Sequence, residues 1–168
     1  MKLLLVRHAI AEDAEPSAAG DADALRPLSE IGRKKMRKGA NRLRSQVDRI
    51  DVLACSPRVR ARETAGIIAR AFGELPVLER PELDFTHPPE AAAEWLGQYP
   101  AETVLAAVGH EPHLGLLSGL LLVAMPCPLI AFRKGGVALL EFPGRATPGK
   151  GVLHWVLTAG QLRGLKQD

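Results

Sequence analysis

Leu3-Leu4-Leu5-Val6-Arg7-His8 is the stretch that decides which fold we expect, and it lies almost at the N-terminus. Four consecutive apolar residues, one of them β-branched, are typical of a strand that is buried on both faces of a sheet. In an open α/β sheet, ligands bind just beyond the carboxyl ends of the strands. The position of Arg7 and His8 therefore predicts a functional site, provided that other strands deliver matching groups to the same edge.

Two more apolar runs end in polar groups. Residues 51–55 lead into Pro57 and a group of arginines, and residues 103–108 lead towards His110. After the first run, the spacing of the apolar residues indicates a helix that begins close to Pro57. Arginines at a helix N-terminus favour anions, because free N–H groups and the positive end of the helix dipole lie there.

Apolar spacing elsewhere predicts helices around a central sheet. A helix is expected to begin at Ser29, its N-cap, and to present a stripe of apolar residues that ends at Val47. The apolar stretch 114–125 is shorter than the ~20 residues that a membrane span needs, so we expect a buried helix. The other predicted elements are a short strand over 75–78, a helix over 90–96 and two strands over 137–142 and 152–158.

The last two strands are joined by residues 143–151, which are rich in glycine and proline and show no helical pattern. A hairpin is expected here, so at least one strand is antiparallel. We therefore predict an α/β fold, a three-layer α/β/α sandwich with a mostly parallel central sheet and at least one antiparallel strand near the C-terminus. The chain has no linker or internal repeat, so residues 1–168 are expected to form a single domain.

The composition is that of an ordinary soluble globular protein, with 46% hydrophobic and 24% charged residues. A net charge of +3 is too small to indicate nucleic-acid binding by itself. Cys55 and Cys127 form neither a disulfide framework nor a zinc pattern, which favours a reducing compartment. We therefore expect a cytoplasmic monomer that binds neither nucleic acid nor membrane.

Two charged segments flank the first strand and the helix that follows it. Residues 11–23 are predicted to be a mobile surface loop beside the site, with their acidic side chains in solvent. The helix after Ser29 has a basic face, for which we favour simple solvation over a docking surface for an acidic partner. That face consists of Arg33, Lys34, Lys35, Arg37, Lys38, Arg42 and Arg44.

If the three strands that end in polar groups are parallel and adjacent, those groups converge on one pocket. It would contain His8, His110, Arg7 and at least one arginine from 58–62. Such a pocket suits a dianion with spread charge, above all a phosphoryl group, and a histidine beside it can attack phosphorus. His113 is expected at a helix start on the rim. No carboxylate or cysteine accompanies the histidines at a known ligand spacing, and arginines repel cations, so we expect no metal and no other cofactor.

These residues resemble the motifs of the histidine phosphatase (phosphoglycerate mutase-like) superfamily. The motifs are Arg7-His8-Ala9, Ser56-Pro-x-x-Arg60-Ala-x-x-Thr64 and Gly109-His110-x-Pro112, in the family's order. A fourth run, Arg26-Pro27-Leu28-Ser29 followed by Gly32, is most similar to the SixA-type phosphohistidine phosphatases. Ala9 stands where the family usually has glycine. Glu111 replaces a common asparagine and adds a negative charge near the pocket.

The resemblance implies that His8 is the nucleophile and becomes phosphohistidine. It also implies which other side chains form the phosphate pocket. Those catalytic and substrate-binding residues are Arg7, Arg60, His110, Arg26 and Ser56. Arg58 and Arg62 are expected to be solvated or to face the substrate.

The sequence does not decide which residue, if any, is the general acid. A phosphoester needs a proton donor for its leaving group, and Glu82 and Asp84 are the candidates. SixA-type members manage without one, since an imidazole protonated on its far nitrogen leaves neutral. We therefore expect a metal-independent phosphatase for phosphohistidine in a protein, such as a histidine-phosphotransfer domain. The alternatives are a small-molecule phosphomonoesterase and, from another class, a non-catalytic phospho-binding module.

Overall fold

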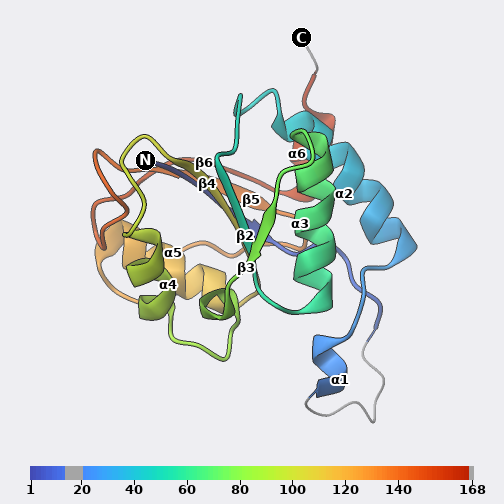
Figure 1. Cartoon of the computed structure of the whole chain (residues 1–168), viewed down its shortest axis with the longest axis horizontal. Helices are drawn as coiled ribbons and strands as arrows, with labels where there is room; N and C mark the ends of the chain where they lie inside the picture. The colour runs from blue at the N-terminus through green and yellow to red at the C-terminus, as the bar shows by residue number, and fades with distance from the viewer. Residues whose placement is uncertain (14–20, 167–168) are drawn as a thin grey trace.

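The computed structural model describes residues 1–13 and 21–166, and these build one six-stranded sheet (Figure 1). The strand order is β3-β2-β4-β1-β5-β6. β1 to β4 run parallel to one another, whereas β5 is antiparallel to both β1 and β6. The bounds are β1 Lys2–Arg7, β2 Val52–Cys55, β3 Val77–Glu79, β4 Val104–Gly109, β5 Val137–Glu141 and β6 Val152–Leu157.

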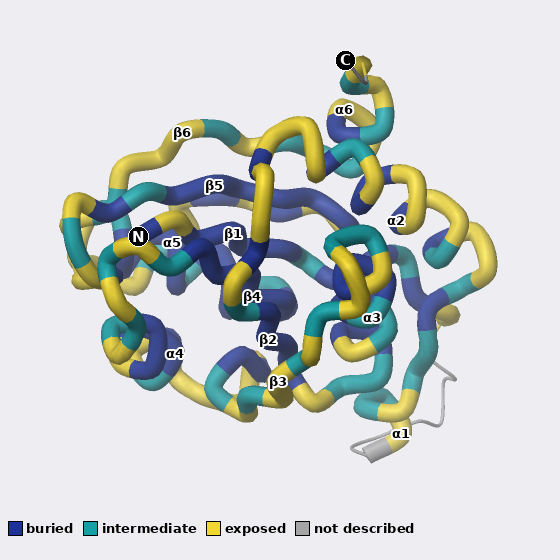
Figure 2. Tube along the Cα trace, turned by 45° about the horizontal axis from the view of Figure 1, so that its top comes forward, coloured by how far each residue is buried: buried dark blue, intermediate teal, exposed yellow. Residues whose placement is uncertain are grey.

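The predicted α/β/α sandwich with an antiparallel hairpin near the C-terminus is confirmed. Leu4 and Val6 of β1 pack in one core cluster, and Leu3 and Leu5 pack in a second cluster. Successive side chains of a strand point to opposite faces, so a strand with apolar residues at every position needs cover on both sides. Figure 2 shows β1 and β4 buried in the middle of the molecule and β6 as the exposed outer strand.

Helices cover the two faces of the sheet. α2 (Glu30–Leu43), α3 (Val59–Ala71) and α6 (Ala159–Gly164) pack on one face. α4 (Pro89–Leu96) and α5 (His113–Val123) pack on the other, as Figure 1 shows. No helix in residues 1–13 and 21–166 combines the length and apolar character that a membrane crossing requires.

α2 begins as predicted. The Ser29 side chain accepts a hydrogen bond from the N–H of Gly32, which satisfies one of the free donors of the first turn. The predicted apolar stripe from Met36 to Val47 is buried against the sheet. The basic residues lie on the remaining surface of the helix, where all except Arg33 and Arg42 are exposed.

The predicted elements differ from the structure in four places, one of them the short 3₁₀ helix η1 (Pro81–Leu83), which was not predicted. Residues 75–78 were expected to form a strand, but the strand is shifted to Val77–Glu79. Part of the predicted loop over 11–23 is a short helix, α1 (Asp21–Ala24), while residues 14–20 lie outside the described residues. α6 was not predicted, although its capping box between Thr158 and Gln161 is a signal that the sequence contains.

Candidate active site

The polar strand ends meet because β1, β4 and β2 are neighbours that run in the same direction. His8 follows β1, Ser56 follows β2, and His110 follows β4. The imidazole rings of His8 and His110 have their centroids 5.0 Å apart. The expected convergence of polar groups is therefore present at the carboxyl edge of the sheet.

His8 is held in one orientation. It is only 5% exposed, and its Nδ1 lies 2.7 Å from the carbonyl oxygen of Ala9. A carbonyl can only accept, so Nδ1 carries the proton and Nε2 keeps a free electron pair. Burial lowers the pKa of His8 to about 4, and the positive charges of Arg60 and Arg7 act in the same direction. The ring is neutral at physiological pH, which is the state that a nucleophile needs.

The backbone around His8 is fixed from several sides. The N–H of Ala9 donates to Thr64 Oγ1 at 3.0 Å, and Thr64 Oγ1 donates to the carbonyl of Arg60 at 2.7 Å. The N–H of His8 bonds the carbonyl of Gly109 at the end of β4. The Ser56–Arg60–Thr64 motif thus ties the start of α3 to the loop that carries His8.

His110 is positioned from behind by Ser56 and Asp84. Its Nε2 lies 2.8 Å from Ser56 Oγ, and the hydroxyl of Ser56 lies 3.2 Å from Asp84 Oδ2. All three side chains are buried. Burial lowers the pKa of His110 to about 2, so its ring is also neutral. Ser56, predicted to bind substrate, is fully buried, and its hydroxyl contacts His110 and Asp84.

An arginine cluster gathers around one carboxylate, that of Asp23. Oδ2 of Asp23 lies 2.8 Å from Arg58 Nη1 and 3.0 Å from Arg60 Nη2, and Oδ1 lies 2.9 Å from Arg26 Nη2. The Asp23 carbonyl also accepts from Arg60 Nη1 at 2.7 Å. Burial of the Asp23 carboxyl group opposes ionisation, but the hydrogen bond and charge of Arg60 outweigh it and lower its pKa. The expectation that the acidic residues of 11–23 are merely solvated is therefore wrong for Asp23.

Several donors in this region have no partner among the described residues. They include Nε of Arg7 and Nε of Arg60, and the ring nitrogen Nδ1 of His110 is unpaired as well. Arg7 uses one terminal nitrogen, Nη1, to bond the carbonyl of Phe132 at 2.6 Å. Buried polar groups normally have hydrogen-bond partners, so a set of unpaired donors at one edge indicates a place for an anion.

The comparisons with known proteins point in the same direction. The family model of the histidine phosphatase superfamily (branch 1) matches residues 3–87, half of the chain. The chain belongs to the histidine phosphatase superfamily. It is therefore a phosphatase, a hydrolase of phosphoryl groups. A search of curated protein sequences finds no significant match.

Among solved structures, the histidine phosphatase SixA in complex with tungstate is 25% identical, with a TM-score of 0.81 over 96% of this chain and 99% of that one. A protein from Agrobacterium tumefaciens assigned as SixA is 22% identical, with a TM-score of 0.75 over 94% and 97%. An Escherichia coli K-12 protein assigned as an alpha-ribazole-5'-P phosphatase is 19% identical, with a TM-score of 0.72 over 95% and 98%. The last two likenesses concern the fold.

For Arg58 of this histidine phosphatase, two predictions were open, that it is solvated or that it faces the substrate. Its side chain is 12% exposed, and Nε lies 2.6 Å from Asp84 Oδ2. The guanidinium stacks on the ring of Phe85 at 4.0 Å, and that ring meets His110 edge-on at 5.6 Å. Arg58 therefore belongs to the site instead of being solvated. Arg62 is half-exposed as expected and forms a long ion pair with Glu79.

The environment of Asp84 does not support a role as general acid. Burial raises the pKa of its carboxyl group, but hydrogen bonds from Arg58 and Thr86 outweigh that effect and lower it to about 2. Asp84 is ionised at neutral pH and has no proton to give. Its place in the structure is to hold Arg58 and, through Ser56, His110.

Glu82 forms an ion pair with Arg80 at 2.7 Å, and no hydrogen bond links it to His8 or His110 among the described residues. Its Oε2 is buried and has no partner in that part of the chain. The two candidate acids therefore have different surroundings. Asp84 is hydrogen-bonded to Ser56 and Arg58 of the site, whereas Glu82 is paired with Arg80.

Glu111 lies two residues before α5, and its carboxylate is engaged in a hydrogen bond. Its Oε1 accepts the N–H of Phe132 at 2.8 Å, next to the Phe132 carbonyl that binds Arg7. Glu111 thereby fixes the segment that positions Arg7. The sequence carried no signal for this contact, because 21 residues separate Glu111 from Phe132.

Two further predictions concern single residues. His113 starts a helix as expected but is 1% exposed, so the prediction that it lies on the rim is wrong. Cys55 is buried as expected, and burial raises the pKa of its thiol to about 12, which excludes a reactive thiolate. Within residues 1–13 and 21–166, no three His, Cys, Asp or Glu side chains are grouped in a way that could hold a metal ion.

Proposed function

We propose that the protein removes the phosphoryl group from phosphohistidine in a partner protein, through a phosphohistidine intermediate on His8 and without a metal ion. The observation that carries the proposal is the state of His8. Its ring is neutral, its Nδ1 proton is held by the carbonyl of Ala9, and its Nε2 is free, while the nearby Arg7 and Arg60 each have an unpaired Nε donor.

In the first step, Nε2 of His8 attacks the phosphorus atom of the substrate. A bond forms between Nε2 and phosphorus, and the bond between phosphorus and the substrate's imidazole nitrogen breaks. The substrate ring leaves as neutral imidazole, because it already carries a proton on its other nitrogen. His8 keeps its Nδ1 proton and becomes a phosphorylated imidazolium, which the Ala9 carbonyl stabilises. Arg7 and Arg60 neutralise the charge on the phosphoryl oxygens.

In the second step, a water molecule attacks the same phosphorus atom. The bond between phosphorus and Nε2 breaks, its electron pair returns to Nε2, and dihydrogen phosphate is released. The Ser56 hydroxyl has a single proton and can direct it to either Asp84 or His110 Nε2. When it turns to Nε2, His110 carries its own proton on Nδ1 and can donate it to a bound phosphoryl oxygen.

The lack of a poised acid favours phosphohistidine over a phosphoester as the substrate. When the phosphoryl group passes from one imidazole to another, the leaving group and the nucleophile are the same kind of ring. Neither step therefore needs a proton from a further acid. An alkyl phosphate would expel an alkoxide, which requires a donor. Asp84 is ionised, and Glu82 is paired with Arg80.

A small-molecule phosphomonoesterase is the second candidate. One observation favours it, namely that Oε2 of Glu82 is buried without a partner among the described residues. It predicts efficient hydrolysis of alkyl phosphates and a loss of that activity in Glu82→Gln.

The test is brief exposure to substrate carrying a labelled phosphoryl group, followed by trapping in alkali. We expect label on the protein that is stable in alkali, labile in acid and absent from His8→Ala. Turnover is compared for a histidine-phosphorylated protein and a panel of alkyl phosphates, with and without a chelator. Undiminished turnover by His8→Ala would refute the intermediate, and a requirement for metal would refute the metal-free mechanism.

A further inference from the structure

A groove runs between α2 and α3 on the outer surface of the molecule. Arg33 and Arg37 of α2 line one side, and Arg62 and Arg70 of α3 line the other. The floor contains Ile67 and other apolar atoms of α3. We call this feature, lined by residues of α2 and α3, the α2–α3 groove.

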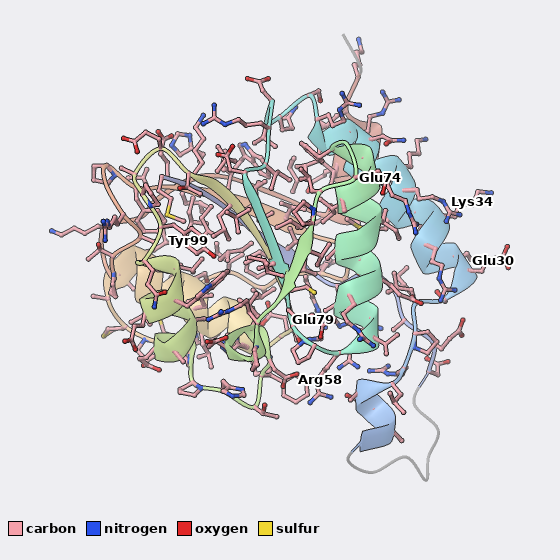
Figure 3. The ribbon with its side chains drawn as sticks, in the orientation of Figure 1. Glu30, Lys34, Arg58, Glu74, Glu79 and Tyr99 are labelled. Carbon is pink, nitrogen blue, oxygen red and sulfur yellow. The ribbon has the colours of Figure 1, made fainter. Side chains whose placement is uncertain are left out.

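The groove begins at the active site. Val59, which lines one end of it, lies between Arg58 and Arg60 at the start of α3. Figure 3 shows Arg58 beside the first turn of α3, and Lys34 on α2 pointing away from α3. From Val59 to Arg70 the groove follows α3 for about three turns, roughly 16 Å at 1.5 Å per residue. A macromolecule that presents its phosphoryl group to His8 would therefore extend over this surface.

The charge of the groove is positive, and two of its four arginines are uncompensated. Four arginines line it against one glutamate, Glu63, and Arg62 pairs with Glu79 outside the lining. Glu63 is engaged with Arg33 at 2.8 Å and with the N–H of Leu28. Arg37 and Arg70 are exposed, and neither has a carboxylate within 4.0 Å among residues 1–13 and 21–166. The groove thus offers the positive charges of Arg37 and Arg70 to a partner, whereas Arg33 and Arg62 are paired within the protein.

The floor is open as well as apolar. A Cβ atom added at Gly66, which lines the middle of the groove, would meet no other heavy atom within 4 Å. Gly66 lies within α3, where glycine costs about 0.5–1 kcal/mol of helix stability relative to alanine. A glycine in that place leaves room for a side chain of another molecule to approach the helix.

We infer that the α2–α3 groove docks an acidic helix of the phosphorylated partner protein. The inference rests on the proposed function, since it supplies the surface that the protein substrate would use. The arginines form ion pairs with carboxylates along the partner helix, and an apolar side chain of that helix packs over Gly66 and Ile67. Such complementary charge raises the association rate and fixes the orientation of the complex.

A protein fits this groove better than a nucleic acid does. Single-stranded nucleic acids are held by aromatic side chains on which bases stack, and the lining of the groove contains none. The carboxylate of Glu63, which also lines the groove, would repel the phosphates of a nucleic acid. An amphipathic helix, by contrast, matches a straight groove with an apolar floor and charged edges.

The experiment compares two substrates of the full-length enzyme. One is a histidine-phosphorylated phosphotransfer domain of net negative charge, and the other is free phosphohistidine, which is too small to reach the groove. We expect Arg37→Glu and Arg70→Glu each to lower kcat/KM for the domain about tenfold, through KM, which corresponds to about 1.4 kcal/mol. Hydrolysis of free phosphohistidine stays unchanged. Gly66→Trp, which fills the floor, has the same selective effect.

Two matched variants serve as controls. Lys38→Glu makes the same charge change on the exposed face of α2 but does not line the groove. Gly66→Ala changes the same position without filling the floor. We expect both to turn over the domain within twofold of the wild-type rate. An equal loss in Arg37→Glu and Lys38→Glu, or an unchanged rate in Gly66→Trp, would overturn the docking site.

Binding of the unphosphorylated domain, measured by titration, separates this inference from the proposed function. If neither phosphohistidine substrate is turned over but Arg37→Glu and Arg70→Glu still weaken binding of the domain, the proposed function fails and the groove stands. If the domain is turned over and the groove variants bind it like the wild type, the groove fails alone. If Arg37→Glu and Arg70→Glu lose binding to single-stranded RNA or heparin but still bind the domain like the wild type, the groove binds polyanions and the inference is overturned.

Discussion

At the scale of single residues, the site depends on which groups already have partners. His8 has its Nδ1 proton engaged and its Nε2 free. Arg58, Arg60 and Arg26, in contrast, share the carboxylate of Asp23. An oxyanion that enters the pocket needs the same donors, so Asp23 competes with it for positive charge.

Replacing Asp23 with asparagine tests this competition. The amide removes the negative charge but keeps an oxygen for the arginines, and the backbone bond from Arg60 remains. We expect tungstate or phosphate to inhibit Asp23→Asn at concentrations about three- to tenfold lower than those needed for the wild type, a modest gain because Asp23 is partly exposed. Asp13→Asn, at an exposed position of the same segment, is the control. Weaker inhibition would mean that Asp23 serves mainly to hold Arg60 in place.

The protonation of His8 can be measured directly. Since its pKa is lowered to about 4, the ring should remain the neutral Nδ1–H tautomer as the pH falls from 7 to 5, and should take up a proton only below that range. Nitrogen chemical shifts of labelled histidine, assigned with His8→Ala, report both tautomer and charge. A titration midpoint above pH 6, or a proton on Nε2, would contradict the state that we assign to the nucleophile.

At the scale of elements, α2 is held against the loop that follows β1. Ser29 donates its backbone N–H to the carbonyl of Ile10, two residues after His8. At Gly32 a Cβ atom would lie 2.0 Å from the same carbonyl oxygen. The close approach of helix and loop therefore requires glycine at this position, whereas Gly66 in α3 faces open space.

The two glycines make a matched pair of substitutions. Gly66→Ala should increase the free energy of unfolding by about 0.5–1 kcal/mol, because alanine favours the helix. Gly32→Ala should decrease it by more than about 1 kcal/mol and lower kcat, because the Ile10 backbone must move. Urea unfolding and steady-state rates measure both effects. A Gly32→Ala protein as stable and active as the wild type would show that the contact is not needed.

At the scale of the whole molecule, three buried histidines make stability depend on pH. His8, His110 and His113 are each at most 5% exposed, and burial lowers the pKa of each. Below their ordinary pKa of 6.5 the unfolded chain therefore binds more protons than the folded one. Stability is fully present above pH 6.5 and is lost as the pH falls, by up to about 1.4 kcal/mol per pH unit for each histidine.

We expect urea unfolding to show a clear loss of stability from pH 7 to pH 5. His113→Phe removes one titrating ring in α5, so its stability should fall less steeply over that range. Leu120→Ala in the same helix should lower stability at every pH while keeping the wild-type slope, because it removes only apolar contacts. If His113→Phe keeps that slope as well, His113 does not contribute to the acid sensitivity.

Much of the fold could be predicted from local pattern. The apolar runs of β1 and β4, the N-cap at Ser29 and the hairpin of β5 and β6 all follow from neighbouring residues. The polar ends of three strands also predicted that His8, His110 and an arginine from 58–62 would meet, because parallel strands present their carboxyl ends at one edge. The sequence by itself thus determined the scaffold and the main residues of the pocket.

Only the tertiary structure decided how those residues are charged and held. Asp23 meets Arg58 across 35 positions of sequence, and Asp84 meets the same arginine across 26. Glu111 reaches the segment that binds Arg7. Whether a carboxylate is solvated, ionised in an ion pair or available as an acid depends on burial and on partners brought close by packing. Those are properties of the assembled fold, and a local pattern of residues carries no information about them.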